Sequence, residues 1–376
     1  MRDLAEIREE IDGIDEQIVS LYEKRMELTS RVAEYKIQTG KPVFDKEREK
    51  SKLESLGKLA SSEENKDGIQ ELFDQIMAMS RKKQYRLLTN HGLGEKTEFT
   101  EVDQLDYSNA RIVFQGLEGA YSQLAMEQFF GENCDSFHVE SWKDAMDAIK
   151  DHRADYAVLP IENSSAGIVS ENYDLLVEYD NYIVGEQVLR VNHALLGVEG
   201  AKESDIKSIY SHKQSLMQCS EFLEQHKEWE KFSLNNNAVA AKKVKEDGIK
   251  SQAAIASAKN AEIYGLKVLR NSIQNNKNNS TRFIIVTGKK IYLKDAKRIS
   301  ICFEINHKSG ALYHALSHFI YNGINMTNIQ SRPLQNKNWE YRFFVDFEGN
   351  FREEAVQNAL RGMRDETISL RILGTL

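Results

Sequence analysis

The chain has 376 residues, with 50 Lys or Arg against 58 Asp or Glu and a formal net charge of -8. This length allows two or three domains with hydrophobic cores of their own. The acidic balance, with no basic tract interleaved with aromatic residues, argues against a nucleic-acid-binding protein. The sequence contains neither a signal-peptide core nor an apolar run long enough to cross a bilayer.

The cysteines are scattered along the chain, at Cys134, Cys219 and Cys302, without the spacing of a metal site. Such cysteines are typical of free thiols in a reducing compartment. No other cluster of metal ligands is evident. We therefore expect a cytoplasmic protein that uses no metal or other cofactor and binds neither nucleic acid nor membrane.

The first block, residues 1–90, has a helical pattern. In the first predicted helix, apolar residues recur at steps of three and four from Leu4 to Tyr35. Asp3 predicts where this helix begins, and Gly40 where it ends. Further helices are predicted at about 45–59 and 66–88. Three helices, one of them very long, bury too little surface alone, which favours an interlocked bundle.

Arg25 interrupts the apolar stripe of the first helix. An unpaired guanidinium in a helical core costs several kcal/mol, so Arg25 either snorkels, pairs with a carboxylate such as Glu6 or Glu10 of a neighbouring helix, or binds an anion. Helical geometry puts Lys36 within roughly 20° of the same face and about 16 Å away, so both cations can converge on one ligand. Arg8 lies about 25 Å from Arg25 along the axis and could join them only from a partner chain.

The second block, residues 110–290, changes period. Short apolar runs alternate with helical stretches, which predicts an α/β fold with parallel strands. These runs are 111–114, 156–159, 209–210 and 253–256. Polar loops rich in glycine and small hydroxyl residues suggest backbone amides and O–H groups that face an anion. These loops are 116–122, 160–167, 210–214 and 279–283.

The third block, residues 296–376, is predicted to have the order βαββαβ of a ferredoxin-like α+β unit. Its strands are expected at 298–305, 324–331, 340–348 and 367–373, and its helices at 309–321 and 352–363. Between the first two blocks, residues 91–109 are polar with little periodicity and are predicted to be a linker.

The first block resembles the all-helical chorismate mutases, in particular the mutase module of bifunctional chorismate mutase/prephenate dehydratases. The resemblance implies an intertwined dimer in which each site takes one first-helix arginine from the other chain. The implied substrate-binding residues are Arg8, Arg25, Lys36, Asp45, Arg48, Glu49, Ser80 and Gln84.

The chemistry implied by this resemblance is the rearrangement of chorismate to prephenate, which needs positioning and electrostatic stabilisation rather than an acid, base or nucleophile. Arg25 and Arg8 of a second copy would hold the two carboxylates. Lys36 and Gln84 would be the catalytic donors to the ether oxygen, and Glu49 would take the ring hydroxyl. For Arg48 and Glu49, a solvated helix face is the alternative.

The second block resembles the prephenate dehydratases through the Pro-Ile-Glu-Asn loop at 160–163 and Thr-Arg-Phe at 281–283. The resemblance implies a bilobal fold like that of periplasmic binding proteins, with the site in the cleft. There prephenate loses carbon dioxide and water to give phenylpyruvate. The implied site residues are Ser122, Glu162, Asn163, Ser165, Ser211, Gln218, Thr281, Arg282 and Phe283.

Two of these residues would be catalytic. Thr281 is implied at the leaving oxygen, where it relays a proton or donates a hydrogen bond, and Arg282 would hold a carboxylate. Leu117 stands where that family usually has Pro. His212 could act as an acid, but a structural role is favoured.

The third block resembles the phenylalanine-binding ACT domains attached to dehydratases, which usually dimerise and bind the end product between subunits. The matching residues are Gly310, Ala311, Leu312, Gln330, Ser331, Arg332 and Pro333. Gln330 replaces the Glu that normally begins the second motif, which leaves the strength of phenylalanine feedback open.

The resemblances together imply a bifunctional mutase and dehydratase with phenylalanine as effector, in a homodimer; whether dimers pair into tetramers stays open. Two alternatives remain. The helical block could serve only for dimerisation beside a monofunctional dehydratase, or the other blocks could form a non-catalytic amino-acid or anion sensor. Thr-Arg-Phe at 281–283 argues against the sensor.

Overall fold

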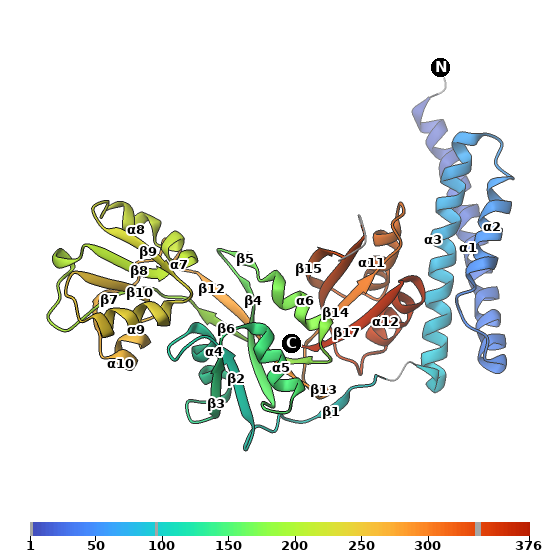
Figure 1. Ribbon diagram of the computed structural model, residues 1–376. Coiled ribbons are helices and arrows are strands. Elements are labelled where there is room, and N and C mark those ends of the chain that lie inside the picture. The colour runs from blue at the N-terminus through green and yellow to red at the C-terminus, as the bar shows by residue number, and fades with distance from the viewer. Residues whose placement is uncertain (1–2, 95–96, 335–339) are drawn as a thin grey trace. The chain divides into compact units, whose positions relative to one another are not determined.

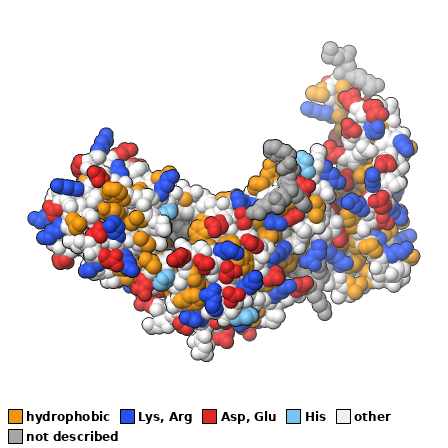
Figure 2. Space-filling model, viewed as in Figure 1, with side chains coloured by type: hydrophobic (Ala, Val, Ile, Leu, Met, Phe, Trp, Pro, Cys, Tyr) orange, Lys and Arg blue, Asp and Glu red, His pale blue; other side chains and the backbone are white. Residues whose placement is uncertain are grey.

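The computed structural model describes residues 3–94, 97–334 and 340–376. The chain forms two compact units, one of residues 1–97 and 302–371, the other of residues 98–301 and 372–376. Within the described residues, no helix is both long and apolar enough to cross a membrane. Figure 2 shows Lys and Arg side chains interspersed with Asp and Glu on one face of the molecule, so neither sign of charge dominates there.

The three predicted helices are confirmed as α1 (Leu4–Thr39), α2 (Lys46–Gly57) and α3 (Glu63–Leu88) (Figure 1). The Asp3 side chain caps α1 by accepting a hydrogen bond from the backbone N–H of Ala5, and Gly40 ends it in the left-handed conformation. A π-helical turn, η1 (Thr89–Leu93), follows α3. The predicted ends of α1 are therefore correct, because both depend on local capping chemistry.

Most of the apolar stripe of α1 is exposed within the chain. Ile11, Ile14 and Ile18 are each more than half exposed, whereas the buried residues of α1 are Met26, Thr29 and Ala33. Burial of a side chain such as Ile contributes about 1.5–3 kcal/mol. The helical module therefore leaves a long apolar face uncovered.

The third block has the predicted order βαββαβ, and its strands pair in the order β15-β16-β14-β17. Its elements are β14 (Arg298–Glu304), α11 (Ala311–Tyr321), β15 (Met326–Pro333), β16 (Tyr341–Glu348), α12 (Glu354–Glu366) and β17 (Ser369–Thr375). Phe303, Phe319, Phe344 and Phe347 are buried, and the ring centroids of Phe319 on α11 and Phe347 on β16 lie 4.8 Å apart. The ferredoxin-like arrangement expected from the sequence is thus present.

The second unit consists of two lobes, each built on a mixed sheet (Figure 1). In the first lobe the strand order is β6-β12-β4-β2-β3. Its strands are β2 (Arg111–Gln115), β3 (Asp135–Val139), β4 (Tyr156–Asn163), β5 (Gly167–Ile168), β6 (Tyr182–Arg190) and β12 (Ser280–Thr287). Its helices are α4 (Tyr121–Phe130), α5 (Trp142–Lys150) and α6 (Ser170–Glu178).

The second lobe has the strand order β11-β7-β10-β8-β9. Its strands are β7 (Ala194–Gly197), β8 (Ser208–His212), β9 (Glu230–Leu234), β10 (Gln252–Ala256) and β11 (Lys267–Arg270). Its helices are η2 (Glu203–Asp205), α7 (Lys213–Gln218), α8 (Ser220–Glu224), α9 (Asn237–Asp247) and α10 (Lys259–Tyr264). The chain enters this lobe through residues 191–193 and leaves it through residues 271–279.

The expectation of parallel strands is only partly correct. β2, β3 and β4 are parallel, as are β8, β9 and β10. β12 instead runs antiparallel to β4 and β6, and β7 antiparallel to β10 and β11. The antiparallel strands arise because the chain crosses between the lobes twice. β6 and β7 take the chain into the second lobe, and β11 and β12 bring it back.

The predicted linker, residues 91–109, contains structure that the sequence pattern did not indicate. β1 (Thr100–Val102) pairs in parallel with β13 (Ile291–Leu293). Phe99 is buried and packs edge to face on Tyr182, with ring centroids 5.2 Å apart, and Leu105 lies in the core of the first lobe. Residues from about 98 onward therefore belong to the second unit, because β1, Phe99 and Leu105 all contact it.

Candidate active sites

A pocket of about 680 Å³ lies on the helical module, and all three helices contribute to it. All of the predicted mutase residues line it except Arg8: these are Arg25, Lys36, Asp45, Arg48, Glu49, Ser80 and Gln84. Six cationic side chains line the pocket, namely Arg25, Arg31, Lys36, Lys41, Arg48 and Lys52. Only Asp45 and Glu49 oppose them among the described lining residues, so the pocket suits a ligand with more than one negative charge.

The two cations from the stripe of α1 have polar partners within the chain. The Arg25 Nη1 donates to Ser80 Oγ at 2.5 Å, and the Lys36 Nζ donates to the carbonyl of Val43 at 2.6 Å. Burial lowers the pKa of both Arg25 and Lys36, with Glu49 acting in the opposite direction. Both side chains are therefore partly desolvated and would gain from an anion in the pocket.

The carboxylate of Glu49 has a partner that the sequence did not suggest. Arg81 on α3 forms ion pairs with Glu49 and with Glu366 at the end of α12, and the Arg81 side chain is only 5% exposed. The guanidinium also lies 4.7 Å from the ring centroid of Phe44. Burial raises the pKa of Glu49, and Arg81 counteracts this shift. Arg81 thus fixes the position of a predicted substrate contact.

Arg8 is described in the structure but is not among the residues that line the pocket. It is exposed on the first turns of α1, seventeen residues before Arg25, which corresponds to about 25 Å along the helix axis. One chain therefore cannot bring Arg8 to Arg25.

The predicted dehydratase residues Thr281, Asn163 and Gln218 come together where the two lobes meet. Thr281 on β12 is the register partner of Asn163 on β4. The Asn163 Nδ2 donates to Thr281 Oγ1 at 2.8 Å, and its Oδ1 accepts from Gln218 Nε2 of the other lobe at 3.3 Å. Thr281 and Asn163 are each 9% exposed. The arrangement presents a buried hydroxyl fixed by amides.

Arg282, the other predicted catalytic residue, contacts carboxylates of the protein. Its guanidinium lies 3.6 Å from Glu162 and 3.7 Å from Glu186, and Glu186 also pairs with Arg298. Successive side chains of a strand point to opposite faces, so Arg282 is directed away from Thr281. Its role as a substrate ligand stays a prediction.

The remaining predicted dehydratase residues have structural contacts. Ser122 donates to the carbonyl of Gln115, and Ser165 Oγ accepts from Asn276 Nδ2 at 3.3 Å. Ser211 Oγ lies 2.7 Å from the carbonyl of Ile255, inside the second lobe. Phe283 belongs to the core of the first lobe, with 2% exposure. His212 caps α7 by accepting a hydrogen bond from the backbone N–H of Gln214, which agrees with a structural role.

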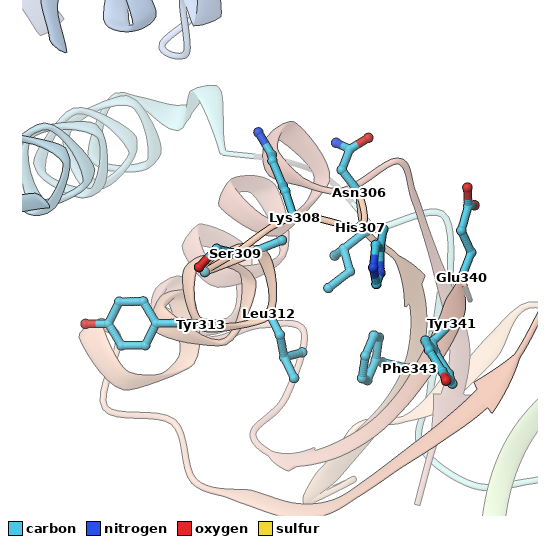
Figure 3. Close-up of a pocket in the computed structure, with 12 residues that line it drawn as sticks. Asn306, His307, Lys308, Ser309, Leu312, Tyr313, Glu340, Tyr341 and Phe343 are labelled. Atoms are coloured by element: carbon cyan, nitrogen blue, oxygen red, sulfur yellow. The ribbon is translucent and has the colours of Figure 1, made fainter. Parts of the chain in front are cut away.

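A second pocket, of about 530 Å³, lies in the ferredoxin-like part at the start of α11. Figure 3 shows Leu312 and Phe343 facing its interior, with Asn306, Lys308 and Glu340 around it. Gly310 and Ala311 also line it, whereas the other predicted effector residues, Gln330, Ser331, Arg332 and Pro333, lie on β15. Apolar side chains surrounded by polar and charged ones suit a small amphipathic molecule.

Comparison with known proteins assigns the first two blocks to protein families. A family model for type II chorismate mutase matches residues 7–85, and one for prephenate dehydratase matches residues 112–291. The bifunctional chorismate mutase/prephenate dehydratase of Buchnera aphidicola subsp. Schizaphis graminum is 34% identical over 378 residues, which cover 99% of this chain and 96% of that protein. The chain belongs to this bifunctional family.

Two further similar proteins support the assignment. The Escherichia coli K12 bifunctional chorismate mutase/prephenate dehydratase is 32% identical and covers 99% of this chain and 95% of that protein. The solved prephenate dehydratase of Arthrobacter aurescens in complex with L-Phe is 27% identical, with a TM-score of 0.66 over 70% of this chain and 89% of that chain. Both enzymes of the bifunctional family are thus present in one polypeptide.

In the mutase and dehydratase domains, sequence reasoning missed the buried polar residues Arg81 and His193, which touch predicted site residues. Arg81 contacts Glu49, and His193 contacts Gln218. Arg81 directly follows Ser80, but neighbouring helical positions differ by about 100° and do not share a face. His193 lies in the crossing between the lobes, a segment without periodicity, so no sequence pattern marked it.

Proposed function

We propose that the cationic pocket of the mutase domain binds chorismate and that a second copy of the chain completes it with Arg8. The observation that carries this proposal is the lining of one pocket by every predicted mutase residue except Arg8. The exposed apolar stripe of α1, including Ile11, Ile14 and Ile18, supports a dimer along this helix. In such a dimer Arg8 of one copy would lie beside Arg25 of the other.

Catalysis in this pocket rests on position and charge. Arg25 and Arg8 of the second copy hold the two carboxylates of chorismate in the compact conformer that rearranges. Lys36 and Gln84 stabilise the negative charge that develops on the ether oxygen as its C–O bond breaks and the new C–C bond forms. Glu49, held by Arg81, accepts a hydrogen bond from the ring hydroxyl. Asp45, Arg48 and Ser80 complete the lining.

The dehydratase step uses the hydroxyl of Thr281. The bond between the ring and its carboxylate breaks, the electron pair moves into the ring, and the ring C–O bond breaks as the hydroxyl leaves. A hydrogen bond from Thr281 stabilises the leaving oxygen, which takes a proton from solvent and departs as water. The products are phenylpyruvate, carbon dioxide and water. Asn163 supports this role, because its Nδ2 occupies the acceptor side of the threonine oxygen.

Phenylalanine is the proposed effector, and the pocket at Gly310, Ala311 and Leu312 is its proposed binding place in an ACT domain. The strand order and the apolar lining support this proposal, as does the L-Phe complex of the Arthrobacter dehydratase. Residues 330–333 on β15 would act from a second copy. The free thiols of the three cysteines support a cytoplasmic location.

The proposal is tested by incubating the purified protein with chorismate and measuring prephenate and phenylpyruvate separately, with and without phenylalanine. We expect prephenate to form and then convert to phenylpyruvate, with slower conversion when phenylalanine is present. A protein that leaves chorismate unchanged would contradict the mutase assignment. Prephenate that accumulates without phenylpyruvate would contradict the dehydratase assignment.

A further inference from the structure

A continuous row of hydrogen-bonding side chains connects Tyr121 to Thr281 in the dehydratase domain. The Tyr121 hydroxyl lies 3.0 Å from His193 Nδ1, and His193 Nε2 lies 2.9 Å from Gln218 Oε1. Gln218 Nε2 contacts Asn163 Oδ1 at 3.3 Å, and Asn163 Nδ2 contacts Thr281 Oγ1 at 2.8 Å. The row passes from the first lobe through the crossing to the second lobe and back.

The backbone determines the direction of these hydrogen bonds at Asn163. Its Oδ1 accepts from the backbone N–H groups of Ser165 at 3.0 Å and Ala166 at 2.9 Å, and neither group can accept a hydrogen bond in return. The Nδ2 of Asn163 must therefore face Thr281. Nδ2 lies 2.8 Å from Thr281 Oγ1, 3.0 Å from Asn279 Oδ1 and 3.1 Å from the carbonyl oxygen of Ser280, so its two protons serve three acceptors. Since Nδ2 cannot accept, the hydroxyl proton of Thr281 has no acceptor among the described residues. That proton is available to a substrate.

The same reasoning continues to His193. Because Asn163 Oδ1 is an acceptor, Gln218 must direct its Nε2 toward Asn163 and its Oε1 toward His193. An amide oxygen cannot donate, so His193 must carry a proton on Nε2. The Tyr121 hydroxyl lies 3.0 Å from Nδ1 of the neutral ring and 2.9 Å from the carbonyl oxygen of Asn192, and its single proton can go to only one of them at a time. From His193 through Gln218 to Asn163, each donor meets an acceptor.

The contacts around His193 fix the position of its ring. Its ring is buried, with 1% exposure of the residue, and burial lowers the pKa of the imidazole, which favours the neutral form. Its backbone N–H donates to Gln274 Oε1 at 3.0 Å, and its carbonyl accepts from the N–H of Ile273 at 3.0 Å. Residue 275 of the same returning segment donates its N–H to the carbonyl of Gln218 at 2.7 Å. The two crossings therefore fix His193 and Gln218 relative to each other.

We propose that His193 is a positioning residue of the dehydratase: its Nε2–H orients the Gln218 amide, whose Nε2–H then helps to hold the Asn163 side chain beside Thr281, so that the Thr281 proton stays directed at the leaving hydroxyl of prephenate. This inference rests on the proposed role of Thr281. His193 does not touch the substrate and transfers no proton to it. Its contribution is the orientation of the Gln218 amide, because the opposite orientation would turn the Gln218 oxygen toward Asn163 Oδ1, which is itself an acceptor.

The test compares substitutions of His193 that keep or remove the donor at Nε2. The amide nitrogen of Gln can occupy the place of Nε2, whereas Leu fills similar space without a donor. We expect His193→Leu to lower kcat for phenylpyruvate formation by about 10- to 100-fold with KM changed much less, as small displacements of reacting groups do. His193→Gln is expected to restore most of kcat. Equal losses in both variants, or no loss in His193→Leu, would overturn the proposal.

Mutase activity of the same polypeptide is the folding control, because chorismate consumption should stay at the level of the unsubstituted protein in every variant. If His193→Leu does not fold, Gln218→Glu replaces it, since a carboxylate accepts from His193 but cannot donate to Asn163. Gln218→Glu should then lower the dehydratase kcat; an unchanged kcat would overturn the proposal. Tyr121→Phe should cause a smaller loss of dehydratase kcat than His193→Leu. A larger loss would contradict the proposal that His193 is the residue that orients Gln218.

A double variant separates this inference from the proposed function. If His193 acts through Thr281, His193→Leu should cause no further loss of kcat in a Thr281→Ala background. A full additional loss would show that His193 acts by another route. Unchanged dehydratase activity in Thr281→Ala alone would instead remove Thr281 from the site, and the proposed function would fail with it.

Discussion

The mutase pocket and the dehydratase centre both handle anions derived from chorismate, but they are built differently. The mutase pocket is open on one chain and lined by six cations, among them Arg25 and Lys36. The dehydratase centre is buried between two lobes and fixes the hydroxyl of Thr281 with the neutral amides of Asn163 and Gln218. In our proposal, the first gains specificity from charge and from a second copy of the chain, and the second gains it from the orientation of hydrogen bonds within one chain.

The largest effect is expected for Arg25→Ala, which tests whether the mutase pocket depends on charge. Loss of a partly desolvated cation that holds a substrate carboxylate should lower mutase kcat/KM by roughly 10³-fold. Dehydratase activity measured from added prephenate should stay near normal, because Thr281 and its partners lie in another unit. Arg25→Lys, which keeps the charge but not the fork geometry, is the matched control and should lose less. Equal losses of both activities would indicate a structural role for Arg25.

Thr281→Ala tests whether the dehydratase centre depends on an oriented hydroxyl group. Removing one donor at a leaving group should lower dehydratase kcat by roughly 10²- to 10³-fold. Mutase activity measured as chorismate consumption should be unaffected. Thr281→Ser keeps the hydroxyl and should retain much more activity than the alanine variant. If Ser and Ala variants were equally active, the hydroxyl would have no part in the reaction.

Arg81 tests whether the mutase pocket depends on orientation as well as charge. Arg81→Met should disturb Glu49 and lower mutase kcat by about 10-fold, since it removes a positioning contact rather than a substrate contact. It should also lower the free energy of unfolding of this unit by about 3 kcal/mol, because Glu49 and Glu366 lose their buried partner. Denaturant titration followed by far-UV circular dichroism measures the second effect. Substitution of exposed Lys50 to Met is the control, and a similar result for both would contradict the role of Arg81.

A smaller effect is expected from pH. Burial lowers the pKa of Lys36, so in the free enzyme Lys36 loses its proton at a lower pH than an exposed lysine does. If the charge of Lys36 is required, mutase kcat/KM is full below this lowered pKa and falls as pH rises through it. Lys36→Arg should move the alkaline limb of the pH profile upward, since arginine keeps its charge. An unchanged alkaline limb would show that a group other than Lys36 causes it.

The sequence predicted those parts of the two sites that depend on spacing. The heptad stripe of α1 placed Arg25 and Lys36 on one face, and the structure brings both into one pocket. Asp3 and Gly40 predicted the ends of α1, because capping is local. The order βαββαβ after residue 298 followed from alternating periods.

Other features depend on contacts between distant segments and could not be predicted in this way. Arg81 is buried between two carboxylates, and the second of these, Glu366, comes nearly three hundred residues later in the chain. His193 lies in an aperiodic crossing, and the direction of its hydrogen bonds depends on the backbone at residues 165 and 166. The antiparallel strand β12 follows from the double crossing, which local patterns do not encode.

The central claim, that each mutase site takes Arg8 from one chain and Arg25 from another, is tested by mixing two inactive variants. Arg8→Ala and Arg25→Ala proteins are unfolded, combined in equal amounts and refolded together, and mutase activity is compared with each variant treated alone. Mixed dimers contain one intact and one doubly altered site, so the mixture should recover about a quarter of the activity of the unsubstituted protein. No recovery, with mixed dimers demonstrated by differential tagging, would contradict a site shared between two chains.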